Sequence, residues 1–303
     1  MTPLRAATVL LGAALVGSGC RATPGRAAGR ADSAELSARA ARLAQTLARP
    51  DSGSDHDRPL ARWVVPVGLS EISGLALTPD QRLLAHDDER GAVSEIDYRR
   101  GVVVKQFLLG KPHTVHGDFE GITVAGDRIF LLASNGNLYE FKEGAAGERV
   151  DYTVHDTHLG KECEFEGVAY DPAIASLLLA CKHVYSKELK NLLVIYRWKL
   201  DQGDGPRLTT LTVPLDQATG ANGWKTLHPS DITVDPMTGN YVLIASQQQA
   251  LIEMSPAGVV LQSRTLPGLH DMAEGVAITR DSILIISDEA VKHPAVVTLY
   301  RWP

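Results

Sequence analysis

The chain lacks the signals of several common function classes. It holds only three cysteines among 303 residues, and its formal net charge is −6. An acidic balance argues against a general nucleic-acid-binding surface, which would be basic. We find no Gly-x-Ser-x-Gly elbow, no phosphate-binding loop and no dinucleotide-binding motif. His113 and His116 have no partner cysteines nearby, so no spacing indicates zinc, and both are interpreted as loop residues.

The N-terminus carries an export signal. The apolar run Ala6–Val16 follows Arg5 and is too short to span a bilayer as a mature helix, which is typical of a secretory signal. Small residues then lead to Cys20, as in bacterial lipoprotein signals, where the cysteine is lipidated. We expect residues 1–20 to be such a signal, with Cys20 anchoring the protein in the cell envelope, at the outer membrane facing the periplasm. The alternative is an ordinary secretory signal with an incidental cysteine.

Residues 21–60 are predicted to be a tether. The first part is rich in Ala, Gly, Pro and Arg without an apolar period, which is typical of a flexible segment. Asp32 or Ser33 is expected to cap a short helix that ends near Arg49. Three leucines share roughly one stripe of that helix: Leu36, Leu43 and Leu47. The stripe is compatible with docking, but we favour a frayed helix that faces solvent.

From Ala61 onward, short runs of Val, Ile, Leu, Thr and Tyr alternate with turn signals, which predicts strands and hairpins. An acidic phrase recurs five times in this region. Its third residues are Ser73, Glu120, Glu166, Ser230 and Glu274, spaced by 47, 46, 64 and 44 residues. Repeats of this length with about four strands each are typical of a propeller.

The sequence therefore predicts an all-β fold, a five-bladed β-propeller over residues 61–303. The last repeat has room for three strands. We expect Arg62–Val67 to supply the missing outer strand, which closes the ring and removes free sheet edges. The long third repeat carries an insertion, with its loops predicted at Lys182–Lys190 and Asp201–Arg207.

At these phrases the sequence resembles the SdiA-regulated family of bacterial propeller proteins. The matching segments are EISGL at 71, DFEGI at 118, EFEGVAYD at 164, QALIEM at 249–254, and AEGVAI with IISDE at 273–289. That family is described as a five-bladed propeller with a bound calcium ion and a distant likeness to NHL-repeat propellers. The resemblance covers residues 61–303 and implies the same fold and metal, but no particular reaction.

The repeated carboxylates are the main candidate site. The innermost strand of each blade lines the channel of a propeller, so Glu120, Glu166 and Glu274 are expected at equal heights around one mouth. Glu71 and Asp231 lie close to them in the pattern. Converging carboxylates repel unless a cation or protons compensate, and Ca²⁺ prefers such oxygen ligands. We predict these five residues as metal ligands, with Ca²⁺ as the cofactor.

A structural interpretation stays open beside the metal. Each carboxylate could accept backbone N–H bonds from the neighbouring blade, and the glycine that follows most of them would ease close packing. Other polar groups lie at the ends of second strands: His86-Asp87-Asp88-Glu89, Ser134-Asn135 and Ser287-Asp288-Glu289. We interpret them as turn and cap residues. Lys182, His183 and Lys187 are interpreted as solvated insertion residues, with a basic rim for an anionic ligand as the alternative.

Cys163 and Cys181 flank the first hairpin of the third repeat. An exported domain meets oxidising conditions, so the two form a possible disulfide, with two buried thiols as the equal alternative.

Two functions remain open from the sequence. The first is a monomeric calcium-binding module of the cell envelope, attached to the membrane by its N-terminal lipid, with an unidentified envelope ligand or protein as partner. The second is a calcium-dependent hydrolase, similar to a lactonase or phosphoesterase, with Glu71, Asp88 or Asp288 as candidate bases.

Overall fold

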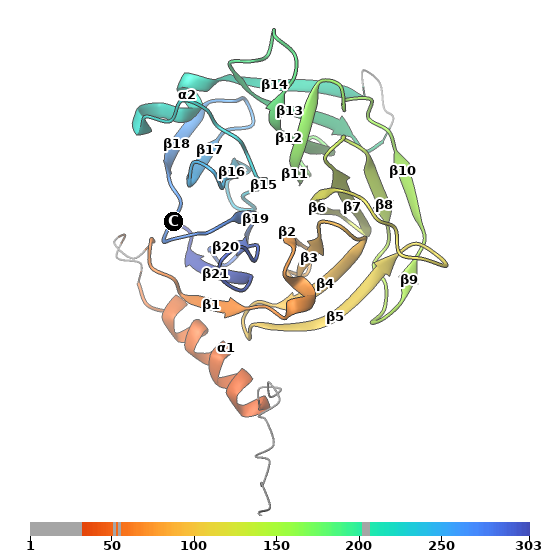
Figure 1. Cartoon of the computed structure of the whole chain (residues 1–303). Coiled ribbons are helices and arrows are strands. Elements are labelled where there is room, and N and C mark those ends of the chain that lie inside the picture. The colour runs from red at the N-terminus through yellow and green to blue at the C-terminus, as the bar shows by residue number, and fades with distance from the viewer. Residues whose placement is uncertain (1–31, 51–52, 54–55, 202–206) are drawn as a thin grey trace, which may run out of the picture.

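The structure, a computed structural model, describes residues 32–50, 53, 56–201 and 207–303. Five β-sheets are arranged as blades around a central channel, with one longer helix outside the ring (Figure 1). The predicted five-bladed propeller is confirmed. The predicted signal with Cys20, the first part of the tether and most of the loop at Asp201–Arg207 lie outside the described residues.

Each blade begins with an inner strand on the channel. From the channel outward, the first blade holds β2 (Ile72–Leu77), β3 (Leu83–Asp87), β4 (Ala92–Asp97), β5 (Val102–Leu109) and β9 (Arg149–Val150). The second holds β6 (Phe119–Ala125), β7 (Arg128–Ala133), β8 (Leu138–Phe141) and β10 (Tyr152–His155). The third holds β11 (Cys163–Asp171), β12 (Ser176–Val184), β13 (Leu192–Lys199) and β14 (Leu208–Pro214).

The fourth blade holds β15 (Asp231–Val234), β16 (Tyr241–Ala245), β17 (Ala250–Met254) and β18 (Val260–Thr265). The fifth holds β19 (Ala273–Ile278), β20 (Ile283–Asp288), β21 (Val296–Arg301) and β1 (Ala61–Val64). Neighbouring inner strands contact one another all the way round, from β2 through β6, β11 and β15 to β19 and back to β2. Aliphatic side chains fill the spaces between adjacent blades, so the core is itself a ring.

The N-terminal strand closes the ring as predicted. β1 pairs antiparallel with β21, and Arg62 lies opposite Thr298. On either side of β1, the Leu60 amide donates to the Leu299 carbonyl at 2.7 Å and the Val65 amide to the Ala295 carbonyl at 3.0 Å. The first and last strands of the domain therefore share one sheet, which covers the edge that β21 would otherwise expose.

Three details differ from the sequence prediction. The short strand β9 pairs in parallel with β5 of the first blade before the chain returns to the second blade as β10. In the third repeat, β12 runs on to Val184, so Lys182 and His183 belong to a strand and not to a loop. The connection to the fourth blade holds two short helices that the prediction missed: α2 (Leu215–Thr219) and η2 (Gly220–Asn222).

The helix α1 (Ser33–Leu47) packs on the ring and does not face solvent on all sides. Asp32 caps it by accepting from the Ala34 amide at 3.1 Å. Leu43 is buried in the cluster that includes Leu69 of η1 (Val67–Leu69). Arg301 of β21 donates to the carbonyl of Thr46 at 2.9 Å. The favoured interpretation of a frayed helix is therefore wrong, because its leucine stripe has a partner. No helix in the described part of the chain is long and apolar enough to cross a membrane.

Candidate functional site

The acidic phrase forms a β-bulge in four of the five inner strands. The pairing register shifts at Ser73 of β2, Glu120 of β6, Glu166 of β11 and Glu274 of β19. A bulge leaves one residue without a cross-strand partner and redirects its side chain. Three of the four bulge residues are glutamates. In these four blades the phrase thus forms the same backbone irregularity at the same position of the inner strand.

The glycine after each bulge lets neighbouring inner strands touch. A Cβ on Gly121 would lie 2.9 Å from the Val168 amide of the next blade. A Cβ on Gly167 would lie 2.7 Å from the Cα of Asp231, and one on Gly275 would lie 3.0 Å from the Leu75 amide. Backbone atoms cannot move aside as a flexible side chain can. The predicted role of these glycines in close packing is therefore confirmed.

Burial and mutual repulsion act on the three bulge glutamates together. Burial raises the pKa of Glu120 to about 9, with the charge of Glu166 as the next cause. Burial also raises the pKa of Glu274 to about 8, again followed by Glu166. The structure thus brings these three predicted residues into one interacting group, because each carboxylate feels the charge of another.

Lys182 supplies a positive charge to this group. Its ammonium donates to Glu166 Oε1. Burial raises the pKa of Glu166 to about 7, and this hydrogen bond and the lysine charge restrain the rise. Burial works to lower the pKa of Lys182, but Glu166, Glu274 and Glu120 outweigh it and the pKa is raised. The interpretation of Lys182 as a solvated residue is therefore wrong.

Asp231 has a different place from the glutamates. Asp231 follows Ser230, which aligns with the three glutamates. It therefore takes the position that a glycine holds in the other four repeats. Its two carboxylate oxygens accept from the Ile232 amide at 2.8 Å and from the Val276 amide of the fifth blade at 2.7 Å. Burial raises its pKa, while these two amides pull the other way. Asp231 ties two blades together, as the structural interpretation expected, and its role as a metal ligand stays a prediction.

A second acidic group lies at the same mouth. Glu71 and Glu289 interact there, and burial, followed by the interaction with Glu71, raises the pKa of Glu289 to about 7. Burial, followed by the Glu71 charge, raises the pKa of Asp88 to about 6. Asp88 Oδ1 is buried and has no hydrogen-bond partner among the described residues. Such an oxygen indicates a place for a cation or a water molecule.

Other residues of the second-strand ends act as turn or pairing residues, as interpreted. Asp87 accepts from the Arg90 amide at 3.0 Å and forms an ion pair with its guanidinium at 2.6 Å. Asp288 pairs with His270 at 2.7 Å in a fully buried position, which leaves it poorly placed as a base. Ser134 donates to Asp118 at 2.5 Å.

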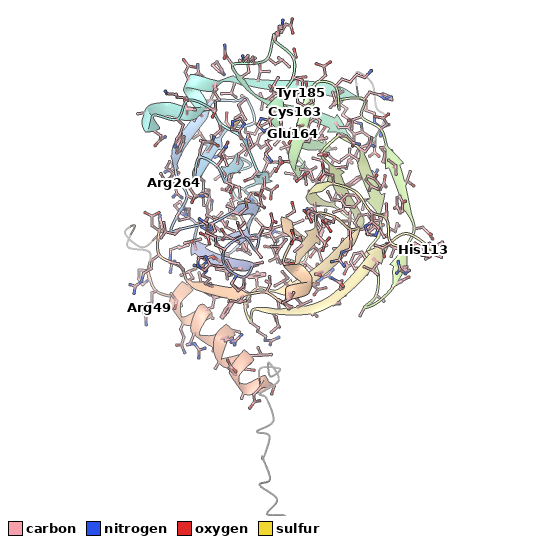
Figure 2. All side chains as sticks on the ribbon, viewed as in Figure 1. Arg49, His113, Cys163, Glu164, Tyr185 and Arg264 are labelled. Carbon is pink, nitrogen blue, oxygen red and sulfur yellow. A yellow bond between two sulfur atoms is a disulfide. The ribbon has the colours of Figure 1, made fainter. Side chains whose placement is uncertain are left out.

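The cysteines of the third blade are joined. The sulfurs of Cys163 and Cys181 form a disulfide between β11 and β12, with the Cα atoms 5.8 Å apart. Tyr185 donates to Glu164 at 3.3 Å in the same part of the molecule (Figure 2). His113 lies far from this region, on an exposed loop at the outside of the ring (Figure 2).

The three bulge glutamates, Glu120, Glu166 and Glu274, are called the carboxylate ring below. Their chemistry suits calcium, but in this structure they are not arranged around an ion site. Their donors are carboxylate oxygens, the ligands that Ca²⁺ prefers. However, no three His, Cys, Asp or Glu side chains among the described residues are placed to hold a metal. The ammonium of Lys182 interacts with the same carboxylates. Any bound cation therefore has to compete with this lysine.

Residues 209–301 match the model of the SdiA-regulated family. The matched stretch runs from β14 through the fourth blade to β21 of the fifth. The resemblance to the SdiA-regulated family, predicted from the repeated phrases, is thereby confirmed over this part of the chain. No curated protein matches the sequence.

Solved structures show a likeness in fold. The PQQ-bound aldose sugar dehydrogenase from Streptomyces coelicolor is 13% identical, with a TM-score of 0.51 over 79% of this chain and 98% of that one. Glutaminyl cyclase from Myxococcus xanthus is 12% identical, with a TM-score of 0.51 over 81% of this chain and 97% of that one. At such low identity these likenesses show the propeller architecture and no activity.

Proposed function

We propose that this protein is an exported, lipid-anchored propeller that binds calcium at its carboxylate ring and acts as a binding module of the bacterial cell envelope. The observation that carries the proposal is the group of three bulge glutamates, whose pKa values are raised by burial and, after it, by neighbouring negative charge. Glu120, Glu166 and Glu274 would hold the ion, with Glu71 beside them. Calcium would supply the positive charge that Lys182 now provides in part.

A calcium titration tests the metal. In chelator-treated protein at pH 8, calcium is expected to raise the melting temperature, because a ligand that binds the folded state stabilises it. Glu120→Gln and Glu274→Gln should weaken binding measured by calorimetry. Glu188→Gln serves as the control, because Glu188 is exposed in the loop after β12. Unchanged melting of the wild type with calcium would count against the proposal.

Anchoring rests on the sequence signal before Cys20 and needs its own test. Cys20→Ser should release the protein from the membrane fraction of cells that express it. Continued membrane association would exclude an acyl anchor. The envelope ligand and the monomeric state belong to the same proposal, and size-exclusion chromatography with light scattering measures the latter.

A calcium-dependent hydrolase is the second candidate. The observation that favours it is Asp88, whose pKa of about 6 suits a base at neutral pH and whose Oδ1 lacks a protein partner in the described structure. A panel of lactones, phosphomonoesters and phosphodiesters, with calcium or chelator, separates the two functions. Calcium-dependent turnover that is lost in Asp88→Asn would favour the hydrolase over the binding module.

A further inference from the structure

A cavity of about 540 Å³ lies at the other end of the inner strands. Strand β6 shows the separation. Glu120 is at its start, whereas Thr123 and Val124, near its end, line the cavity. Four residues of extended chain separate Glu120 from Val124, which corresponds to about 13 Å. The cavity is therefore distinct from the carboxylate ring. Its volume falls in the range of roughly 300–1,000 Å³ that is typical of small-molecule sites.

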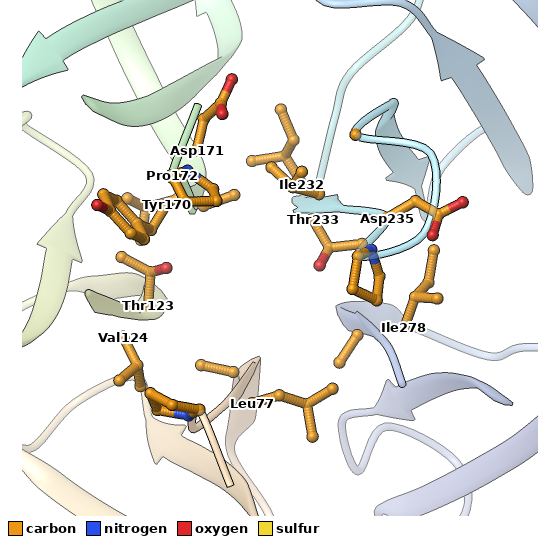
Figure 3. Close-up of a pocket in the computed structure, with 18 of the residues that line it drawn as sticks. Leu77, Thr123, Val124, Tyr170, Asp171, Pro172, Ile232, Thr233, Asp235 and Ile278 are labelled. Carbon is orange, nitrogen blue, oxygen red and sulfur yellow. The ribbon is translucent and has the colours of Figure 1, made fainter. Parts of the chain in front are cut away.

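We propose that this cavity binds one small, uncharged, largely apolar molecule that carries a hydrogen-bonding group. All five inner strands contribute to its wall, so a ligand there would lie on the channel axis (Figure 3). Aliphatic side chains make up much of the lining: Leu77, Val124, Ile232 and Ile278. Burial of apolar ligand surface against these side chains supplies the driving force for binding.

The charged residues of the lining are already engaged. Asp171 accepts from the Tyr241 hydroxyl at 2.6 Å and from the Ala173 amide at 2.9 Å. Asp235 accepts from the Met237 amide at 2.9 Å and from Trp302 at 3.2 Å. Both carboxylates point away from the centre of the cavity (Figure 3). A charged ligand would lose its hydration there without gaining an ionic partner, which disfavours it.

Arg280, the remaining charged residue of the lining, is held at the rim. Its guanidinium donates to the Pro79 carbonyl at 3.3 Å, and its amide donates to Gln81 at 2.9 Å. These contacts bridge the fifth and first blades. The arginine therefore links the two blades at the rim, where its side chain is exposed to solvent. Because its charge is hydrated there, it gives a ligand inside the apolar part of the cavity little ionic stabilisation.

Two hydroxyl groups supply the polar recognition. Thr123 of β6 and Thr233 of β15 point their hydroxyls toward the interior of the cavity (Figure 3). Within the described residues, neither hydroxyl makes a hydrogen bond to another side chain or to the backbone. A hydroxyl both donates and accepts, so a ligand with a hydroxyl or carbonyl group would satisfy either threonine.

The rim is rigid, which keeps the cavity open before a ligand arrives. Pro79, Pro172 and Pro236 follow the inner strands of three blades and fix the backbone there. Asp171 and Asp235 fasten two of these turns through the amides of Ala173 and Met237. A preformed site loses little entropy on binding, so a small molecule can bind without rearranging the ring.

Methyl NMR with three matched probes tests this proposal: adamantanol, adamantane carboxylate and adamantyl ammonium. We expect adamantanol to shift the methyl signals of Val124, Ile232 and Ile278 in a saturable manner. The two charged probes should bind at least about tenfold more weakly, because the apolar wall of the cavity offers them no counter-charge to replace their hydration. The full methyl spectrum also reports whether each variant is folded.

Threonine variants identify the polar contact. Thr123→Val and Thr233→Val keep the shape but remove a hydroxyl, and at least one should weaken adamantanol binding by about 2- to 10-fold, the effect of one hydrogen bond. Thr212→Val, on the exposed face of β14, is the matched control and should bind like the wild type. Absence of saturable shifts, equal binding of the charged probes, or unchanged affinity in both threonine variants would overturn the proposal. Loss of calcium binding has no bearing on it.

Discussion

Lys182→Met is the sharpest test of the electrostatics of the carboxylate ring. The change removes the ammonium and keeps an unbranched side chain. Glu166, whose side chain is only 6% exposed, then loses its ion-pair partner. Glu120 and Glu274 lose the positive charge that acts on both. The folded protein then holds three crowded, buried carboxyl groups with less positive charge to offset their repulsion.

The expected cost follows from the burial of the pair. Removing one partner of a buried ion pair costs about 3–5 kcal/mol. The side chain of Lys182 is 33% exposed, which places the cost at the lower end. A propeller of this size loses roughly 2–4 °C of melting temperature per kcal/mol. At pH 8, without divalent cations, the melting temperature should therefore fall by roughly 6–12 °C.

The pH dependence separates charge from packing. A carboxyl whose pKa is raised by folding gives stability that is complete below its unfolded pKa of 4.5 and is lost as pH rises through the folded value, here about 7 to 9. At pH 5 the glutamates hold protons in the folded protein, so Lys182→Met should change the melting temperature far less than at pH 8.

Calorimetric melts at both pH values measure the effect. Lys187→Met, in the exposed loop that follows β12, is the control and should melt like the wild type. The double variant Lys182→Met with Glu166→Gln should recover part of the loss, because no unpaired charge remains at that position. An equal loss at pH 5 and pH 8 would refute the electrostatic reasoning and assign Lys182 a packing role.

Three further outcomes are expected. Without divalent cations, the wild type should lose stability between pH 5 and pH 9. A melting temperature that does not change with pH would contradict the raised pKa values of the carboxylate ring. Reduction of the disulfide, or Cys181→Ser, should cost about 3 kcal/mol, since the bond closes a loop of 18 residues; unchanged urea denaturation under reductant would contradict this. A chain that begins at Pro66 lacks β1 and should aggregate through the exposed edge of β21, whereas one that begins at Leu60 should remain soluble.

Much of the fold could be predicted from the repeated phrase. The turn signals between short apolar runs predict the hairpins, and the strand count of the last repeat predicts the closure by β1. The docking of α1 could not be predicted, because an isolated leucine stripe does not tell what covers it. The same holds for β9, whose two residues pair with an edge that forms only when the first blade is folded.

The role of Lys182 could have been found by aligning the second strands. The bulges set Ile72 opposite Asp87, Phe119 opposite Ala133, Phe165 opposite Cys181 and Ala273 opposite Asp288. The residue that follows each of these partners along the chain is therefore equivalent: Asp88, Ser134, Lys182 and Glu289. The length of the third repeat instead predicts a loop at Lys182. Strand register, and not repeat length, determines which side chains reach the mouth.

The last prediction concerns protons. With pKa values of about 9 and 8, Glu120 and Glu274 are largely protonated at pH 7. Glu166 accepts a hydrogen bond from the Lys182 ammonium, whose positive charge offsets its own. The other two equivalent positions carry serines, and Ser230 donates to the Ala273 carbonyl at 2.7 Å.

A ring in this state is close to neutral. A divalent cation that binds there must therefore displace protons, because metal ligands have to be ionised. Calorimetric calcium titrations at pH 7, in buffers of different ionisation enthalpy, should show the release of between about one and two protons per ion. Calcium affinity should rise as pH increases from 6 to 9. Binding without proton release would place the ion away from Glu120 and Glu274, even if the affinity for calcium were high.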